Sequence, residues 1–190
     1  PERGYWITSI YDDELCIEDA VPTDSDIEYT LHSGSNLISF PSAGSVGVGD
    51  ALPDNIEVAV SGVITEGAAC SQIAQDTWVG SECSFNGGRG YWMITTLGIY
   101  FSFDLSTLGR INTDLPSEKL AGYEFAQSTE QAFYFLEDIE NIEVGDWILA
   151  YNGDEVIGAR QWQGSIIDVP AMGNDGSDFT QVYIESGSVP

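Results

Sequence analysis

Apolar side chains recur at every second position along much of this chain, and this alternation limits its possible folds more than any other feature. The clearest runs are Ile56, Val58 and Val60; Ile99, Phe101, Phe103 and Leu105; and Trp147, Leu149 and Tyr151. A period of two places successive side chains on opposite faces of a strand, so each run predicts a β-strand with one buried face. Clusters of Gly, Asn, Asp, Pro and Ser interrupt the runs at short intervals, as in sandwiches and barrels. The sequence therefore predicts an all-β fold: two sequential β-sandwich-like modules of antiparallel strands with almost no helix.

Two local elements are predicted in more detail. Residues 147–151 and 154–162 alternate on either side of Asn152 and Gly153. An Asn-Gly pair accepts the positive φ angles of a type I′ turn, so these residues predict a tight β-hairpin. Residues 48–52 are expected to form one helical turn, because Pro53 follows them and cannot continue a helix.

An internal repeat suggests how the chain is organised. The tetrapeptide Arg-Gly-Tyr-Trp occurs at residues 3–6 and again at residues 89–92, each time before a strand-like stretch. A repeat of this kind is typical of modular chains. We expect residues 1–22 to be the tail of a preceding repeat or an N-terminal strand arm, and the chain to be an excised piece of a longer protein. The expected modules that follow are residues 23–107 and 123–190, joined by a linker at residues 108–122.

The charge of the chain excludes several classes of partner. Asp and Glu number 31 against five Lys and Arg, which gives a formal net charge of −26. Nucleic acids and anionic membranes are bound through cationic side chains, so neither is an expected partner. No stretch reaches the roughly 18 apolar residues of a membrane span, so membrane insertion is not expected. An aromatic content of 12% argues for a folded chain rather than acidic disorder.

The cysteines favour an exported protein. Cys70 and Cys83 are close enough in sequence to form a disulfide on the scale of a hairpin, which leaves Cys16 unpaired. Disulfides persist in oxidising compartments, and the scarcity of Lys also suits an extracellular protein. We therefore predict the disulfide and a secreted or cell-surface location. The alternative is three buried, reduced thiols.

Two sets of motifs resemble modules of large bacterial secreted and cell-surface proteins. Residues 34–41 match a "GxNLISxP" opening, and a Gly-Tyr-Trp strand follows at residues 90–92. The second set resembles a companion module of the same proteins. Its motifs are QAFYF (131–135), GDWI (145–148), YNGD (151–154), GARQW (158–162) and DVPAMG (168–173). The matches cover most of residues 31–190. The resemblance implies a β-rich surface module and export, and it implies no particular reaction; such modules continue beyond the position of Pro190 with another strand.

The inventory of reactive residues argues against catalysis. His32 is the sole histidine and no Cys-X-X-Cys pair occurs, so nucleophilic triads and zinc sites are not expected. Residues 87–90 are rich in glycine but lack the Lys-Ser/Thr of a phosphate loop, and they are interpreted as a turn. Carboxylate pairs with glycosidase spacing arise by abundance in so acidic a chain and carry little weight. A non-catalytic protein is expected.

Calcium is the expected cofactor. Ca²⁺ takes six to eight oxygen ligands, and loops rich in Asp, Asn and Gly supply them. The leading predicted ligands are Asn174, Asp175 and Asp178, and the second set is Asp146, Asn152 and Asp154. For each cluster the alternative is a solvated turn.

Two functions remain. The first is a structural or adhesive subunit of an extracellular filament or repeat array, in which Tyr5, Trp6 and Ile7 contact a neighbouring subunit head to tail. The alternative for this segment is that residues 1–22 fold back onto residues 23–107. The second function is a calcium-dependent, glycan-binding accessory module of a larger secreted enzyme. Its sugar-stacking candidates are the tryptophans Trp78, Trp147 and Trp162, for which packing in the core is the alternative.

Overall fold

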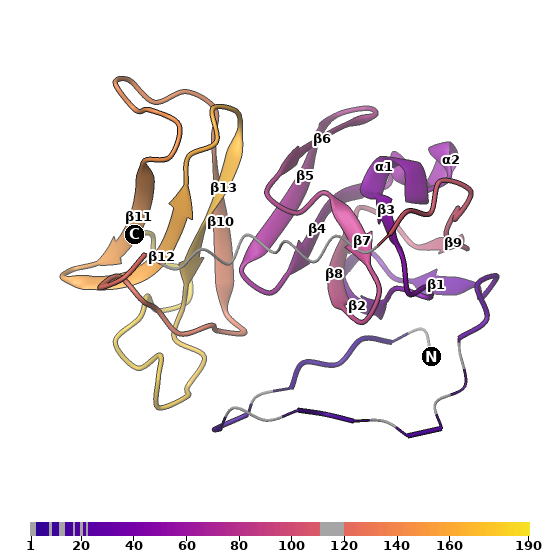
Figure 1. The fold of residues 1–190 in the computed structure, drawn as a ribbon, viewed down its shortest axis with the longest axis horizontal. Coiled ribbons are helices and arrows are strands. Elements are labelled where there is room, and N and C mark those ends of the chain that lie inside the picture. Colours follow the sequence, from indigo (N-terminus) through magenta and orange to yellow (C-terminus); the bar gives the residue numbers. More distant parts are fainter. Residues whose placement is uncertain are drawn as a thin grey trace. The chain divides into compact units, whose positions relative to one another are not determined.

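The predicted all-β fold is confirmed. The computed structural model describes residues 3–7, 9–11, 14–16, 18–19, 21, 23–110 and 120–190, and Figure 1 shows strands with two single-turn helices. The chain divides into two compact units. The first comprises Pro1–Thr65, Gln72–Trp78 and Cys83–Thr113, and the second comprises Glu66–Ser71, Val79–Glu82 and Asp114–Pro190. Most of the predicted linker, residues 111–119, lies outside the described residues.

The main sheet of the first unit has the strand order β2-β8-β4-β5-β6. Its strands are β2 (Gly34–Ser39), β8 (Gly90–Thr95), β4 (Val60–Thr65), β5 (Ala68–Ala74) and β6 (Thr77–Gly80). Only residues 72–78 of β5 and β6 belong to the first unit. β8 pairs antiparallel with both β2 and β4. Two smaller antiparallel pairs join β1 (Tyr29–Leu31) to β9 (Ile99–Phe101) and β3 (Ser45–Gly47) to β7 (Ser84–Asn86).

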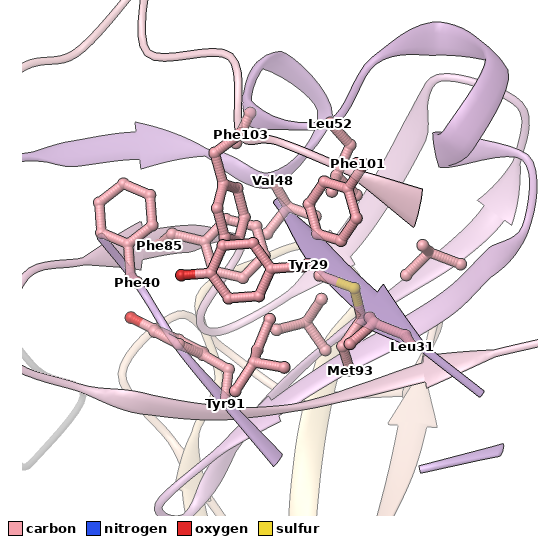
Figure 2. Packing of buried hydrophobic residues seen from close by; sticks show 14 of the residues in the cluster. Tyr29, Leu31, Phe40, Val48, Leu52, Phe85, Tyr91, Met93, Phe101 and Phe103 are labelled. Carbon is pink, nitrogen blue, oxygen red and sulfur yellow. The ribbon is translucent and has the colours of Figure 1, made fainter. Parts of the chain in front are cut away.

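An aromatic cluster fills the first unit (Figure 2). Phe103 lies at its centre, with ring centroids 4.9–5.2 Å from those of Tyr29, Phe40, Phe85 and Phe101 in edge-to-face arrangements. Such pairs add about 0.5–1.5 kcal/mol each beyond the apolar area they bury. Because these rings come from segments far apart in the sequence, the cluster stabilises the sheets against one another within this unit.

The second unit contains two antiparallel strand pairs. β10 (Gln131–Leu136) pairs with β13 (Ile167–Met172), and β11 (Trp147–Asn152) pairs with β12 (Glu155–Gln161). The buried residues between them are mostly small or aliphatic: Ala150, Ile157, Val169, Ala171, Met172, Tyr183 and Ile184. β12 and β13 approach so closely that a Cβ at Gly158 would meet the carbonyl oxygen of Pro170 at 1.7 Å. Only glycine fits at this position.

Proline 53 explains why one predicted strand is partly helical. The expected turn at residues 48–52 is present as α1 (Val48–Ala51), but Asp54–Glu57 forms a second turn, α2. The Pro53 carbonyl accepts hydrogen bonds from the amides of Ile56 and Glu57, at 2.7 and 2.9 Å. Strand structure therefore begins at Val60, and the prediction of a strand through residues 56–58 is wrong.

The predicted hairpin is present, but its turn is displaced by one residue. Asn152 pairs with Glu155, so the loop is Gly153 and Asp154. Of these two loop residues Gly153 alone has a positive φ, +62°, which rules out the predicted type I′ turn. Tyr151 of β11 pairs with Val156, but the adjacent Ala150 pairs with Gly158, so the pairing skips Ile157. This bulge at Ile157 changes the register and moves the turn.

Candidate functional site: the N-terminal arm and the edge of strand β2

The N-terminal arm, which we define as the described residues from Arg3 to Val21, exposes an unusual amount of apolar surface. Tyr5 is 80% exposed and Ile7 is 70% exposed, and Trp6 between them is half-buried. Four further large apolar side chains of the arm are also exposed: Ile10, Tyr11, Leu15 and Val21. Contiguous apolar surface of this kind marks an interaction site in proteins that fold in water.

The arm begins on strand β2. Arg3 forms an isolated antiparallel bridge with Ile38, and the amide of Gly4 donates a hydrogen bond to the carbonyl of Leu37, at 3.1 Å. A Cβ at Gly4 would lie 2.6 Å from the Ile38 oxygen, so glycine is required for this close approach. β2 is the terminal strand of its sheet, and the bridge lies on the edge that β8 does not occupy.

A groove of 540 Å³ accompanies this edge of β2. It is lined by Arg3, by residues 28–32 of β1 and its ends, by residues 35–38 of β2, and by Trp92 of β8. Its walls include buried core residues such as Leu31 and Ile38. The groove is therefore an opening onto the side of the first core, next to the point where the arm is attached.

The predicted subunit-contact residues are thus available for contact. Tyr5 and Ile7 leave most of their surface uncovered by their own chain, although Arg3 and Gly4 just before them are bonded to β2. That a neighbouring subunit covers them stays a prediction. Cys16, on the same arm, is a free and exposed thiol, whereas the predicted disulfide between Cys70 and Cys83 is confirmed.

Trp78 is engaged with a buried carboxyl group in the first unit. Glu57, at the end of α2, is only 2% exposed, and its Oε1 accepts a hydrogen bond from Trp78 Nε1 at 2.5 Å. Burial raises the pKa of the Glu57 carboxyl, and the neighbouring Asp76 raises it further, while the Trp78 hydrogen bond acts in the opposite direction. No sequence signal pointed to Glu57. Trp162, another candidate for sugar stacking, is 7% exposed and lies in the interior.

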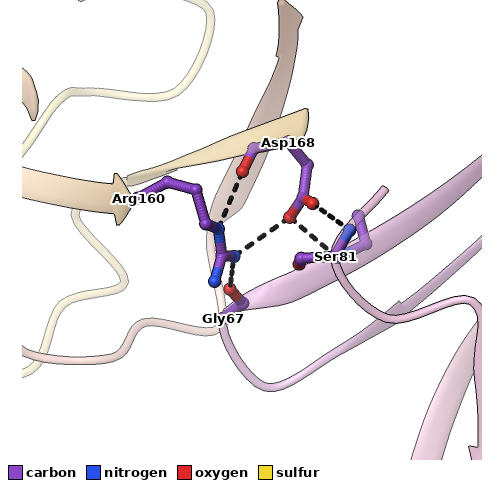
Figure 3. A network of polar contacts seen from close by, with 5 residues as sticks. Gly67, Ser81, Arg160 and Asp168 are labelled. Carbon is purple, nitrogen blue, oxygen red and sulfur yellow. Dashed lines mark hydrogen bonds and ion pairs between the residues drawn. The ribbon is translucent and has the colours of Figure 1, made fainter. Parts of the chain in front are cut away.

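The second unit contains a buried ion pair (Figure 3). Arg160 lies 3.0 Å from the carboxylate of Asp168, and its guanidinium also donates to the main-chain carbonyls of Asp168 and Gly67. Asp168 is 0% exposed, and its two carboxylate oxygens accept from the amides of Ala69, at 3.1 Å, and Ser81, at 2.5 Å. Both carboxylate oxygens are therefore engaged in hydrogen bonds within the unit. The arrangement holds residues 66–71 and 79–82 in the second unit.

The leading predicted calcium ligands form a hydrogen-bonded loop. Asp175 accepts from Thr180 Oγ1 at 2.6 Å, from the Ser177 amide at 3.1 Å and from the Thr129 amide at 3.0 Å. These bonds, led by that of Thr180, lower the pKa of Asp175. Asn174 Oδ1 accepts from the Gly176 amide. The oxygens of these two residues thus already have protein donors.

The other predicted ligands are dispersed. Asp178 accepts from Gln181, Asp146 accepts from the Glu143 amide, and Asn152 donates to the carbonyl of Val182. Asp154 is exposed at the hairpin tip. Within residues 23–110 and 120–190 and the described parts of the arm, no three His, Cys, Asp or Glu side chains are grouped to hold a metal. Calcium binding stays a prediction.

Neither helix in the described part of the chain has the length and apolar character needed to cross a bilayer. The candidate site that remains is the exposed arm together with the groove at β2. Comparisons of the chain with protein-family models, with curated proteins and with solved structures find no match.

Proposed function

We propose that the protein is a non-catalytic structural subunit of an extracellular or cell-surface assembly, in which copies join head to tail through the N-terminal arm. The observation that carries this proposal is the exposure of Tyr5 and Ile7, at 80% and 70%, directly after Arg3 and Gly4, which are bonded to β2. Extended apolar segments of this kind are covered by adding to the sheet of a partner.

The arm is large enough to supply a stable interface. Each buried aromatic side chain removes about 150–250 Å² from water, and specific interfaces bury about 1,200–2,000 Å² in total over both partners. The arm carries three aromatic residues, Tyr5, Trp6 and Tyr11, and several aliphatic ones. Its burial against an equal area of a partner therefore reaches the range of specific interfaces.

The acidity of the chain sets the conditions for association. A net charge of −26 makes copies repel one another, and salt screens this repulsion over a Debye length of about 8 Å at physiological ionic strength. Calcium would act in the same direction by neutralising exposed carboxylates such as Asp154 and Asp178. Association is expected to strengthen as salt or calcium is added. The disulfide between Cys70 and Cys83 supports an oxidising, extracellular setting.

The test is sedimentation of the full chain over a range of concentrations, with electron microscopy of the associated material. We expect the wild type to form chains of subunits at high concentration in salt, and the double substitution Tyr5→Ser and Ile7→Ser to remain monomeric. The matched control replaces an exposed aromatic and an exposed aliphatic residue elsewhere, Tyr100→Ser and Val144→Ser, which are 66% and 74% exposed. A wild type that stays monomeric in high salt and in calcium contradicts the proposal.

A further inference from the structure

We infer that the groove beside β2 is the acceptor for the arm of a second copy of this chain: residues 3–7 of one copy replace the neighbour's own Arg3 and Gly4 on β2 and pair there as an antiparallel strand. This inference rests on the proposed function, and it specifies which surface receives the arm. The argument depends on the free edge of β2, on the register that Arg3 sets, and on the internal repeat.

The free edge of β2 has backbone groups available for pairing. The Leu37 carbonyl points to this edge, because it accepts the Gly4 amide there. Backbone groups on a strand alternate between its two edges, so the N–H and C=O of Ser35 point the same way. Among the described residues, no hydrogen bond to another strand occupies this side of Ser35. An incoming strand would find its hydrogen-bonding partners at this position.

The register of the existing bridge determines where the arm's side chains would lie. With Arg3 opposite Ile38, continuation of the antiparallel pairing places Tyr5 opposite Asn36 and Ile7 opposite Gly34. Ile38 and Asn36 are 2% and 8% exposed, so their side chains face the core. Tyr5 would therefore enter the groove, and Ile7 would lie beyond its end, opposite Gly34.

The second copy of the internal repeat lies in β8, on the other edge of β2, and its side chains alternate between the core face and the outer face in the same way. In β8, Tyr91 pairs with Ile38 and is 1% exposed, while Trp92 pairs with Leu37 and is only half-buried. The second copy of the repeat thus directs its tyrosine to the core and its tryptophan to the outer face. In the inferred register the first copy does likewise, with Tyr5 on the core face and Trp6 on the outer face. Both copies of the repeat would then pack against the same strand.

The length of the arm favours a second copy over the chain's own arm as the occupant. The arm covers residues 3–21, roughly three times as many residues as the six of β2. The groove extends over residues 35–38 of β2, which pair with residues 3–6 of an arm, so it accommodates only the beginning of the arm. Occupation by the chain's own arm would leave Ile10, Tyr11, Leu15 and Val21 exposed, as they are now. A neighbouring copy offers further surface to cover them.

The experiment is a complementation test in a Cys16→Ser background, which removes the exposed free thiol. The acceptor is blocked by Ser35→Pro, which removes the amide that an added strand would use. The donor is blocked by Tyr5→Ser together with Ile7→Ser. Each variant alone is expected to be monomeric, and an equimolar mixture is expected to form one-to-one complexes. In the mixture, one variant retains an intact arm and the other retains an intact groove.

A second acceptor variant leaves the β2 backbone unchanged. Thr30→Trp fills the groove from β1, and Thr77→Trp, at an exposed position of β6, is its matched control. We expect Thr30→Trp to weaken association at least about tenfold, which corresponds to 1.4 kcal/mol, and the control to leave it unchanged. Thermal melting and the disulfide content verify that each variant is folded.

The outcomes separate the two proposals. If the wild type associates through its arm but Ser35→Pro and Thr30→Trp associate equally well, β2 is not the acceptor, and the proposed function is unaffected. If both blocked variants and their mixture remain monomeric, the arm occupies its own groove, and the inference is overturned. If the wild type itself is monomeric in high salt and calcium, the proposed function fails and the inference fails with it.

Discussion

The two units share antiparallel strands but fill their interiors differently. The first unit packs aromatic rings around Phe103, with centroids 4.9–5.2 Å apart. The second has a core of mostly small and aliphatic residues and buries the ion pair of Arg160 and Asp168 beside it. Apolar packing contains no group that titrates, whereas a buried charge depends on its partner. The comparison predicts that the ion pair beside the second core depends on its partner charge, whereas the aromatic core of the first unit depends on no charge.

The carboxyl groups extend this contrast. In the first unit the pKa of Glu57 is raised by burial, so its ionisation opposes folding. In the second unit the pKa of Asp175 is lowered by hydrogen bonds, so its ionisation supports folding. A fall in pH should therefore act in opposite directions on the two units: protonation of Glu57 stabilises the first unit, and at lower pH, below 3.8, protonation of Asp175 destabilises the second.

The largest expected effect is on the ion pair. Arg160→Met leaves Asp168 buried without its cation, and we expect a loss of about 3–5 kcal/mol in unfolding free energy by urea titration. Phe103→Ala in the first unit should cost a similar amount by creating a cavity. The two costs differ in origin: Arg160→Met leaves an unpaired buried charge in the second unit, whereas Phe103→Ala leaves a cavity in the first. An Arg160→Met cost below about 1 kcal/mol would show that the second unit does not depend on its ion pair and would remove the contrast between the units.

Calcium should stabilise the second unit alone, because all six predicted ligands lie in it. Binding only to the folded state contributes about 2.7 kcal/mol at a hundredfold excess over Kd. Thermal melts in chelator and in millimolar calcium should then differ by several degrees. The difference should disappear when Asp178 and Asp154 are both replaced by Asn. Superimposed melting curves of the wild type would reject calcium binding.

Asp175→Ala should destabilise the second unit by about 1–3 kcal/mol at neutral pH, because the donors of Thr129, Ser177 and Thr180 lose their acceptor. The folded-state pKa of Asp175 lies below its ordinary value of 3.8. Its contribution is therefore complete above pH 3.8 and is lost as the pH falls through the folded-state value. Denaturant titrations across the acid range measure this. A difference from wild type that persists undiminished in strong acid would show that the loop is stabilised in another way.

The smallest effect expected is a gain in stability. Glu57→Gln keeps an oxygen acceptor for Trp78 and removes a buried charge, so a stabilisation of about 0.5–1 kcal/mol is expected at neutral pH. Since the folded-state pKa of Glu57 is above its ordinary value of 4.5, stability falls as the pH rises from there through the folded-state value. The variant should lack this decline. Asp54→Asn, at an exposed position of the same helix, is the control and should change little.

Sequence reasoning succeeded where the determinants are local. Alternation at Trp147, Leu149 and Tyr151 predicted the strand β11, although its other face, with Ile148 and Ala150, is the one that packs in the core. Spacing suggested the disulfide between Cys70 and Cys83. Sequence reasoning failed where a nearby residue changes the conformation that the alternating pattern predicts. Pro53 starts a helical turn within an apparent strand, and the bulge at Ile157 displaces the hairpin turn by one residue.

The candidate site was predictable only in part. The repeat drew attention to Tyr5, Trp6 and Ile7, but the groove at β2 depends on strand order, which no local pattern encodes. The partners of Asp168 are 87 and 99 residues away in the chain, at Ser81 and Ala69. Interactions over such separations are determined by tertiary packing. For the same reason the oxygen-rich loop at Asp175 suggested calcium, whereas the structure shows its oxygens bonded to Thr129, Ser177 and Thr180.

The second unit is built from segments that are separated in the sequence, and this has a consequence for how such a chain evolves. Residues 66–71 and 79–82 belong to this unit and supply the amides that bind Asp168. A recombination crossover between residues 110 and 120 would transfer Asp168 and Arg160 to another gene without Ala69 and Ser81. The recipient would inherit a carboxylate that has lost two of its donors. A duplication or exchange that preserves folding must therefore carry the coding sequence for residues 66–82 together with that for residues 114–190.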